Sequence, residues 1–172
     1  SIVIEEQLNN TNNAIINYTK AIDFNPNCYQ AYVARGLIYS NLGKSKKALE
    51  DMNSAILICQ TDADAYYNRG VLSYKLNDKE KALRDYNKAL SLNPNHLKAL
   101  TNRGALRCIV KDYEGAIEDC TKVIEADPND ERAYYNRGMA HYMLQDFPKA
   151  YLDFSKAYDL NPENEETKKY KS

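Results

Sequence analysis

The cysteine and histidine side chains are the first candidates for chemistry in this chain of 172 residues. Metal ligation needs such residues clustered at short spacings, as in a Cys-x-x-Cys pair. The four cysteines form no such pair and the two histidines are far apart in the sequence: Cys28, Cys59, Cys108, Cys120, His96 and His141. We therefore expect no metal site. We interpret Cys120 as core filler and the other cysteines as incidental thiols of a reducing, cytoplasmic compartment.

The remaining side chains form no recognisable catalytic motif. The sequence shows no Ser/His/Asp arrangement, no glycine-rich phosphate loop and no paired carboxylates at a catalytic spacing. The chain is therefore predicted not to be an enzyme and to need no cofactor.

An arginine and an aspartate recur together at a constant spacing of sixteen residues. The pairs are Arg35–Asp51, Arg69–Asp85, Arg103–Asp119 and Arg137–Asp153. If the two positions lie at similar heights on facing antiparallel helices, each guanidinium can donate charge-assisted hydrogen bonds to its carboxylate. We predict that these pairs join two helices rather than bind a ligand.

A 34-residue repeat positions these residues. AYYNRG occurs at 65–70 and again at 133–138, with ALTNRG at 99–104 and AYVARG at 31–36 in the same register. Each repeat reads as two helices, which Asn-Pro or Asp-Pro steps end in most repeats. Three further columns recur: Gly36, Gly70, Gly104 and Gly138; Ala48, Ala82, Ala116 and Ala150; Met52, Tyr86, Cys120 and Phe154. We expect the glycine to face the alanine at a close helix crossing, with the third column filling the next layer.

This pattern resembles the tetratricopeptide repeat, W-x2-L-G-x2-Y, A-x3-F and P within 34 residues. Tyr32, Tyr66, Leu100 and Tyr134 stand in the tryptophan column, and the arginines replace the family's leucine. The resemblance implies an all-α, right-handed superhelical solenoid of antiparallel helix pairs. It divides the chain into a truncated unit at 1–28, units at 29–62, 63–96, 97–130 and 131–164, and a tail at 165–172.

The first eight residues and the tail at 165–172 fall outside the complete repeats. SIVIEEQL is expected to be the end of a first helix, separate from the helix that follows, in a fragment of a longer protein. The tail either caps the array or begins a further repeat. An apolar surface left at the truncated first unit could drive self-association between chains.

The same resemblance implies that the first helix of each pair lines a concave wall. Asn68, Asn102 and Asn136 form a column there, which resembles the asparagine ladder in the repeat arm of the nucleocytoplasmic sugar transferase that modifies Ser and Thr. An amide both donates and accepts hydrogen bonds, so a row of amides can bind an extended peptide backbone. The alternative is that these amides bond to neighbouring helix ends or face water. The predicted peptide-binding residues are Asn68, Asn102, Asn136, Tyr67, Tyr74, Lys75, Lys98, Arg132, Tyr135 and Tyr142, in an exposed stripe that also includes Val71, Thr101, Ala105, Cys108, Ile109, Met139 and Met143.

Two functions stay open at this point. The first is a protein–protein interaction scaffold that binds an extended peptide or a partner helix in its concave groove. The second is a structural spacer or self-association segment of a larger protein, which could be an enzyme. A net charge of −1 argues against nucleic acid or an anionic membrane as the partner, and no apolar run is long enough to span a bilayer. Lys75, Lys98 and Arg132, set against Asp64, favour a mildly acidic ligand segment.

Overall fold

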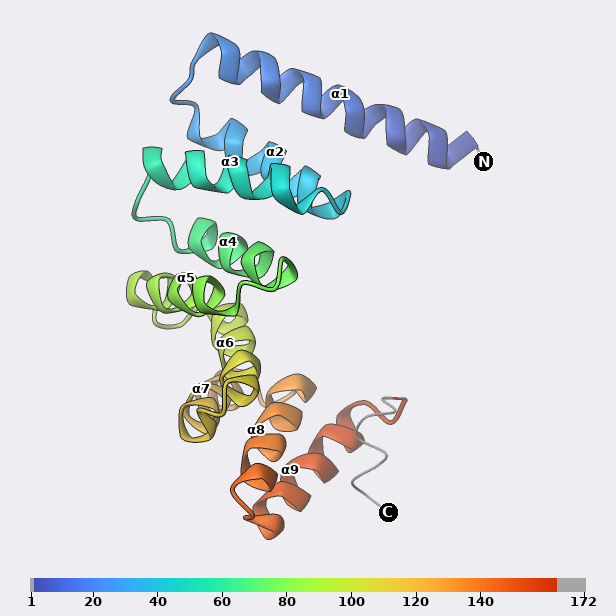
Figure 1. Cartoon of the computed structure of the whole chain (residues 1–172). Coiled ribbons are helices and arrows are strands. Elements are labelled where there is room, and N and C mark those ends of the chain that lie inside the picture. The colour runs from blue at the N-terminus through green and yellow to red at the C-terminus, as the bar shows by residue number, and fades with distance from the viewer. Residues whose placement is uncertain (1, 164–172) are drawn as a thin grey trace. The chain divides into compact units, whose positions relative to one another are not determined.

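The computed structural model describes residues 2–163, without the side chains of residues 2–8. Every regular element in this part of the chain is an α-helix (Figure 1), which confirms the predicted all-α class. After a first helix the elements alternate between 13 and 14 residues in length. The helices are α1 (Ile2–Phe24), α2 (Tyr29–Asn41), α3 (Ser45–Ile58), α4 (Ala63–Lys75), α5 (Lys79–Leu92), α6 (Leu97–Ile109), α7 (Tyr113–Ala126), α8 (Glu131–Met143) and α9 (Phe147–Leu160).

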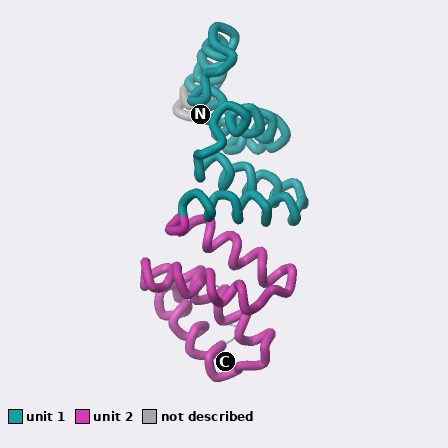
Figure 2. The backbone as a smooth tube through the Cα atoms, turned by 90° about the vertical axis from the view of Figure 1, so that its left-hand side faces the viewer, with its two compact units in different colours: residues 1–93 teal, residues 94–172 magenta. Residues whose placement is uncertain are grey.

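The chain forms two compact units, residues 1–93 and residues 94–172 (Figure 2). In the first unit, α2 packs against α3 and α4 against α5, while α1 contacts α2 and α3 contacts α4. In the second unit, α6 packs against α7 and α8 against α9, and α8 contacts both α6 and α7. Each unit is thus a stack of helix hairpins in which the first helices of neighbouring hairpins also meet.

Aspartate side chains determine where most of these helices begin. At five helix starts an aspartate accepts a hydrogen bond from a backbone N–H two or three residues ahead, as an N-cap does. These caps are Asp62, Asp78, Asp112, Asp130 and Asp146. His96 caps α6 in the same way, because its Nδ1 accepts from the N–H of Ala99 at 3.2 Å. By contrast, Lys44 at the start of α3 makes no side-chain cap.

The glycine column allows the two helices of each hairpin to cross closely, as predicted. A Cβ placed on Gly70 would lie 2.7 Å from Cε1 of Tyr86 and 3.3 Å from the backbone oxygen of Ala82. The same Cβ on Gly138 would lie 2.9 Å from the ring of Phe154. The two distances to the rings, 2.7 and 2.9 Å, are shorter than real Cβ contacts, so the glycine leaves the space that the large side chain of the second helix fills.

The expectation of a separate first helix at SIVIEEQL is wrong. α1 is one uninterrupted helix of 23 residues, from Ile2 to Phe24. The stretch contains no glycine or proline, and Pro26 is the first residue that forces a helix to stop. The asparagines at 9–13 lower helix propensity without breaking the helix. The predicted cap or repeat at 165–172 lies outside the described residues.

Candidate functional site

The four predicted arginine–aspartate pairs all form. In each pair the Nε and Nη2 atoms of the arginine donate to the two carboxylate oxygens of the aspartate. For Arg103 and Asp119 the distances are 2.8 and 2.6 Å, and Asp119 is completely buried. This two-point geometry is the strong form of a charge-assisted hydrogen bond. The pairs join the two helices of a hairpin, as predicted.

The same arginines also reach the preceding repeat, which the sequence analysis missed. Nη1 of Arg35 donates to Oγ1 of Thr19 at 2.9 Å, and Nη1 of Arg69 donates to Oδ1 of Asn53 at 3.2 Å. In the second unit, Nη1 of Arg137 donates to Oγ1 of Thr121 at 3.2 Å. A polar residue sixteen positions before each arginine was the signal. Each of these arginines therefore belongs to the interior of the stack rather than to a ligand site.

A second arginine reinforces one pair in the second unit. Nη1 of Arg107 donates to Oδ2 of Asp119 at 3.0 Å and to the carbonyl of Gly115 at 2.9 Å. Its Nε lies 3.1 Å from Oδ2 of Asp112, the cap of α7. Arg107 did not stand out in the sequence because its repeat position carries a different residue each time: Tyr39, Ser73, Arg107 and His141.

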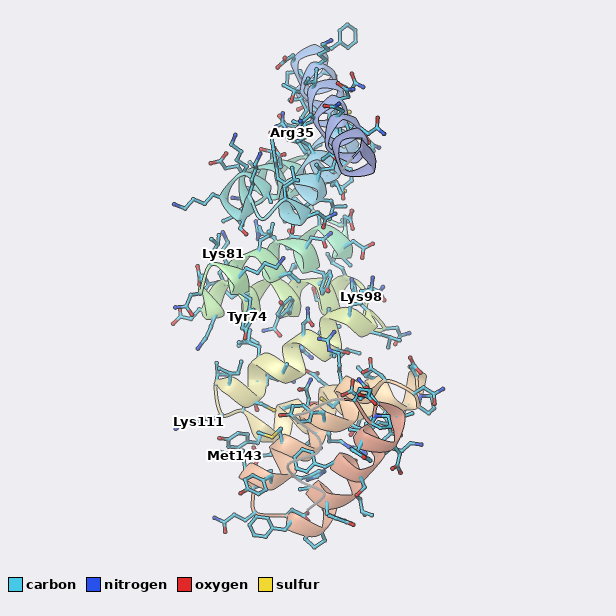
Figure 3. All side chains as sticks on the ribbon, turned by 90° about the vertical axis from the view of Figure 1, so that its right-hand side faces the viewer. Arg35, Tyr74, Lys81, Lys98, Lys111 and Met143 are labelled. Atoms are coloured by element: carbon cyan, nitrogen blue, oxygen red, sulfur yellow. The ribbon has the colours of Figure 1, made fainter. Side chains whose placement is uncertain are left out.

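The predicted amide row of the second unit lies on α6 and α8, which are neighbours. Nη2 of Arg132 donates to Oδ1 of Asn102 at 3.1 Å, from the start of α8 to α6. Further along, the thiol of Cys108 lies 3.6 Å from the backbone oxygen of Asn136. Lys98 is exposed and stands four residues before Asn102, hence on the same face of α6 (Figure 3). The structure thus brings the predicted cations and amides of this unit together.

The tyrosines of the predicted site divide into two kinds. The Tyr135 ring lies 5.8 Å from that of Phe154, and the Tyr67 ring lies 6.1 Å from that of Tyr86. These two tyrosines are half-buried against the third column of their own repeats. Tyr142, whose ring contacts Phe147 edge-on at 5.6 Å, keeps 44% of its surface exposed. The second kind can contribute more apolar area to a ligand.

In the first unit, α4 carries the remaining predicted residues. Asn68 is half-buried beside the half-buried Tyr67, and Tyr74 and Lys75 are exposed at the end of the helix. Within the described part of the chain, the side-chain amides of Asn68 and Asn136 are not used by the hydrogen bonds that hold the helices together. They are therefore not committed to the fold in the way that the arginines are.

One member of the predicted stripe is wrongly placed. Thr101 is only 4% exposed, and its hydroxyl donates back to the carbonyl of Leu97 at 3.1 Å. Its short side chain stays against the α6 backbone, whereas the tyrosines at the same repeat position, Tyr67 and Tyr135, stay partly exposed. The stripe is consequently interrupted on α6 at the level of Asn102.

The four cysteines are unpaired, and Cys120 is completely buried in the third column, as its interpretation as core filler requires. Burial raises the pKa of the Cys108 thiol to about 11, the nearby Asp112 carboxylate adding to the effect. Among the described residues, no three His, Cys, Asp or Glu side chains are grouped as a metal site would need. None of the helices in that part of the chain is both long and apolar enough to cross a membrane.

Profiles of the tetratricopeptide repeat match residues 3–28, 17–50, 63–96, 98–130 and 131–164. The comparison with curated protein sequences gave no significant match. Among solved structures, YrrB, described as a TPR protein with an unusual peptide-binding site, superposes with a TM-score of 0.85 at 24% identity, over 98% of this chain and 87% of that one. MamA gives 0.83 at 26% identity over 98% and 95%. A tetratricopeptide repeat protein from Parabacteroides merdae gives 0.83 at 25% over 95% and 65%.

Proposed function

Because the chain belongs to the tetratricopeptide repeat family, whose members serve as protein–protein interaction scaffolds, we propose that it binds an extended peptide along its first helices. The observation that carries this proposal is the composition of that surface. In the first unit α4 carries the amide of Asn68 and the exposed ring of Tyr74, and in the second unit α6 and α8 carry the amides of Asn102 and Asn136 and the exposed ring of Tyr142. The arginine and aspartate columns, by contrast, are engaged in the hydrogen bonds that join the two helices of each hairpin.

A peptide backbone has its own N–H and C=O groups, which an asparagine side chain can match with one acceptor and two donors. Binding of this kind depends little on the sequence of the ligand. Lys75 adds positive charge to the first helix of the first unit that carries Asn68, and Lys98 and Arg132 add it to those of the second unit, which favours ligands that carry acidic residues. The peptide-binding site named for YrrB is a property of that protein, and it makes the same class of ligand reasonable here.

The test is a selection of random peptides displayed on phage, followed by affinity measurements with synthetic copies of the enriched peptides. The Asn68→Ala/Asn102→Ala/Asn136→Ala variant should bind these peptides about tenfold more weakly or worse, because the lost hydrogen bonds contribute roughly 0.5–1.5 kcal/mol each. Its helicity and melting temperature must first match those of the original chain.

The matched control removes three exposed asparagines of α1, as Asn10→Ala/Asn13→Ala/Asn17→Ala. This control should bind the enriched peptides with unchanged affinity. Equal binding by the first variant would place the peptide elsewhere on the chain and contradict the proposal.

A second candidate, self-association, is favoured by a separate observation on α1. Phe24 is 92% exposed and Ile16 is 50% exposed on this helix. If α1 mediates pairing of two chains, the weight-average mass in sedimentation velocity should rise with protein concentration. Ile16→Ser/Phe24→Ser should abolish the rise, whereas a constant monomer mass for the original chain would dismiss this function.

A further inference from the structure

The surface of the second unit changes its chemistry along the direction of its first helices. Lys98 and Arg132 occupy the second residue of α6 and of α8, and both are exposed. At the far end, Ile109 is 47% exposed. Met143, which is labelled in Figure 3, is 48% exposed. Both helices carry a cation, then an amide, then apolar side chains at helical spacing: Lys98, Asn102, Ala105 and Ile109 on α6, and Arg132, Asn136, Met139 and Met143 on α8.

The apolar end is wider than these two side chains. Further exposed apolar residues come from the last turn of α8, from the turns that follow α6 and α8, and from the start of α9: Tyr142, Val110, Leu144 and Phe147. The edge-on contact between the rings of Tyr142 and Phe147 spans one of these turns. Such a group of apolar side chains at one place is typical of a binding surface rather than of isolated exposed residues.

An acidic residue at the cationic end, Asp130, is engaged in the fold. The Asp130 carboxylate caps α8 by accepting from the N–H of Ala133 at 2.8 Å. The cations that remain on the amide face are Lys98 and Arg132, and the Arg132 guanidinium is held there by Asn102.

From these observations we propose the ligand class of this surface: an extended peptide carrying a carboxylate side chain about five residues away from a bulky apolar side chain. This inference rests on the proposed peptide-binding function. Lys98 and Ile109 are eleven residues apart, which corresponds to about 17 Å along an α-helix. An extended peptide advances about 3.3 Å per residue, so about five residues cover that length. The peptide runs along the axes of α6 and α8, because the polarity changes in that direction.

The first unit lacks this arrangement. On α4 the corresponding stripe starts with Asp64 and ends with Lys75, so its charge order is different. On α2 the start is the uncharged Gln30. The acidic part of the ligand should therefore be recognised by the second unit and not by the first.

The test uses fluorescently labelled synthetic peptides of identical composition, each with two glutamates and a Leu-Phe pair in a Ser/Ala host. The separation between the acidic and apolar pairs is about two, five or eleven residues, the last matching a helical ligand. Fluorescence anisotropy with the full chain should show the tightest binding at five. Binding at the other separations should be about tenfold weaker or more, since one apolar side chain then stays in water.

Two variants test whether the charge of Arg132 contributes to binding at this place or only through the net charge of the protein. Arg132→Ala should weaken binding of the five-residue peptide about threefold at low salt and leave a glutamine version of the peptide unaffected. Arg84→Ala removes the same charge from an exposed position on α5 and should change nothing. Tightest binding at eleven residues, equal binding at all separations, or no effect of Arg132→Ala would each overturn the inference. If these peptides fail while the library peptides bind through the asparagines, only the inference falls; if both sets fail, the proposed function falls too.

Discussion

Replacement of Asp119 by asparagine tests how the hairpins are held together. The Asp119 carboxylate is completely buried and accepts three hydrogen bonds, two from Arg103 and one from Arg107. Asparagine has almost the same shape but presents an NH2 group to a guanidinium that has only donors. The variant thus loses the charge and leaves positive groups without their acceptor.

The loss in free energy of unfolding caused by Asp119→Asn can be compared with the loss caused by the same change at Asp153, in the same unit. Removing one partner of a buried ion pair costs about 3–5 kcal/mol. The arginine side chains are 14% to 21% exposed, so water relieves part of this cost and the lower end applies. Asp153→Asn, which disrupts the Arg137 pair, should cost about 3 kcal/mol. Asp119→Asn loses one more bond to a charged group and should cost about 1.5 kcal/mol more.

Urea denaturation, followed by circular dichroism at 222 nm, measures the free energy of unfolding of both variants. A double-mutant cycle measures the contribution of the bond between Arg107 and Asp119. The cycle combines Arg107→Ala with Asp119→Asn and should give a coupling free energy of about 1–2 kcal/mol. An Asp119→Asn variant that is no less stable than Asp153→Asn, together with additive effects in the cycle, would refute this reasoning.

Three further predictions concern single positions. Lys44→Asp should stabilise the first unit by about 1 kcal/mol, because α3 begins without the N-cap that an aspartate supplies elsewhere, and thermal unfolding against Lys44→Ala as control would show it. Gln145→Gly should stabilise the second unit by about 0.5–1 kcal/mol in urea titrations, since the residue has a φ of 62° that glycine adopts without strain; a loss of stability would contradict this. Hydrogen bonds from Thr61 lower the pKa of Cys59, whereas burial raises the pKa of Cys108 and Cys120, so alkylation at pH 8 followed by mass spectrometry should modify Cys59 first and Cys120 only after unfolding. Modification of Cys120 before unfolding would show that this side chain is accessible in the folded protein, against its complete burial in the structure.

The sequence was sufficient for the interior of each hairpin, because the interior repeats. Gly70 faces Ala82 and Tyr86 at a crossing that the spacing of small residues already required. The pair of Arg69 and Asp85 followed from the constant spacing of sixteen residues, which places both at similar heights on antiparallel helices. In both cases two residue types recur at a constant separation along the chain. Because four repeats carry the same pair, the pairing of these positions can be predicted from the sequence.

Contacts that appear only once could not be predicted in this way. Arg107 stands at a repeat position with no common residue type, so its bond to Asp119 becomes visible only in three dimensions. Thr101 looked like a surface residue because its column holds tyrosines in the neighbouring repeats. The continuity of α1 was missed because the repeat register suggested a turn that no residue of that stretch enforces. The bond from Arg132 to Asn102 joins two neighbouring first helices, whose separation cannot be read from the repeat pattern.

The central claim is that the asparagines of the first helices bind a peptide backbone. Its most direct test is a two-dimensional 1H–15N NMR titration of the chain with a peptide from the library, following the side-chain NH2 signals. Signals assigned to Asn102 and Asn136 should shift in proportion to the occupancy of the site, while those of Asn10 and Asn13 on α1 stay in place. Shifts confined to α1 or to the second helices of the hairpins would contradict the account.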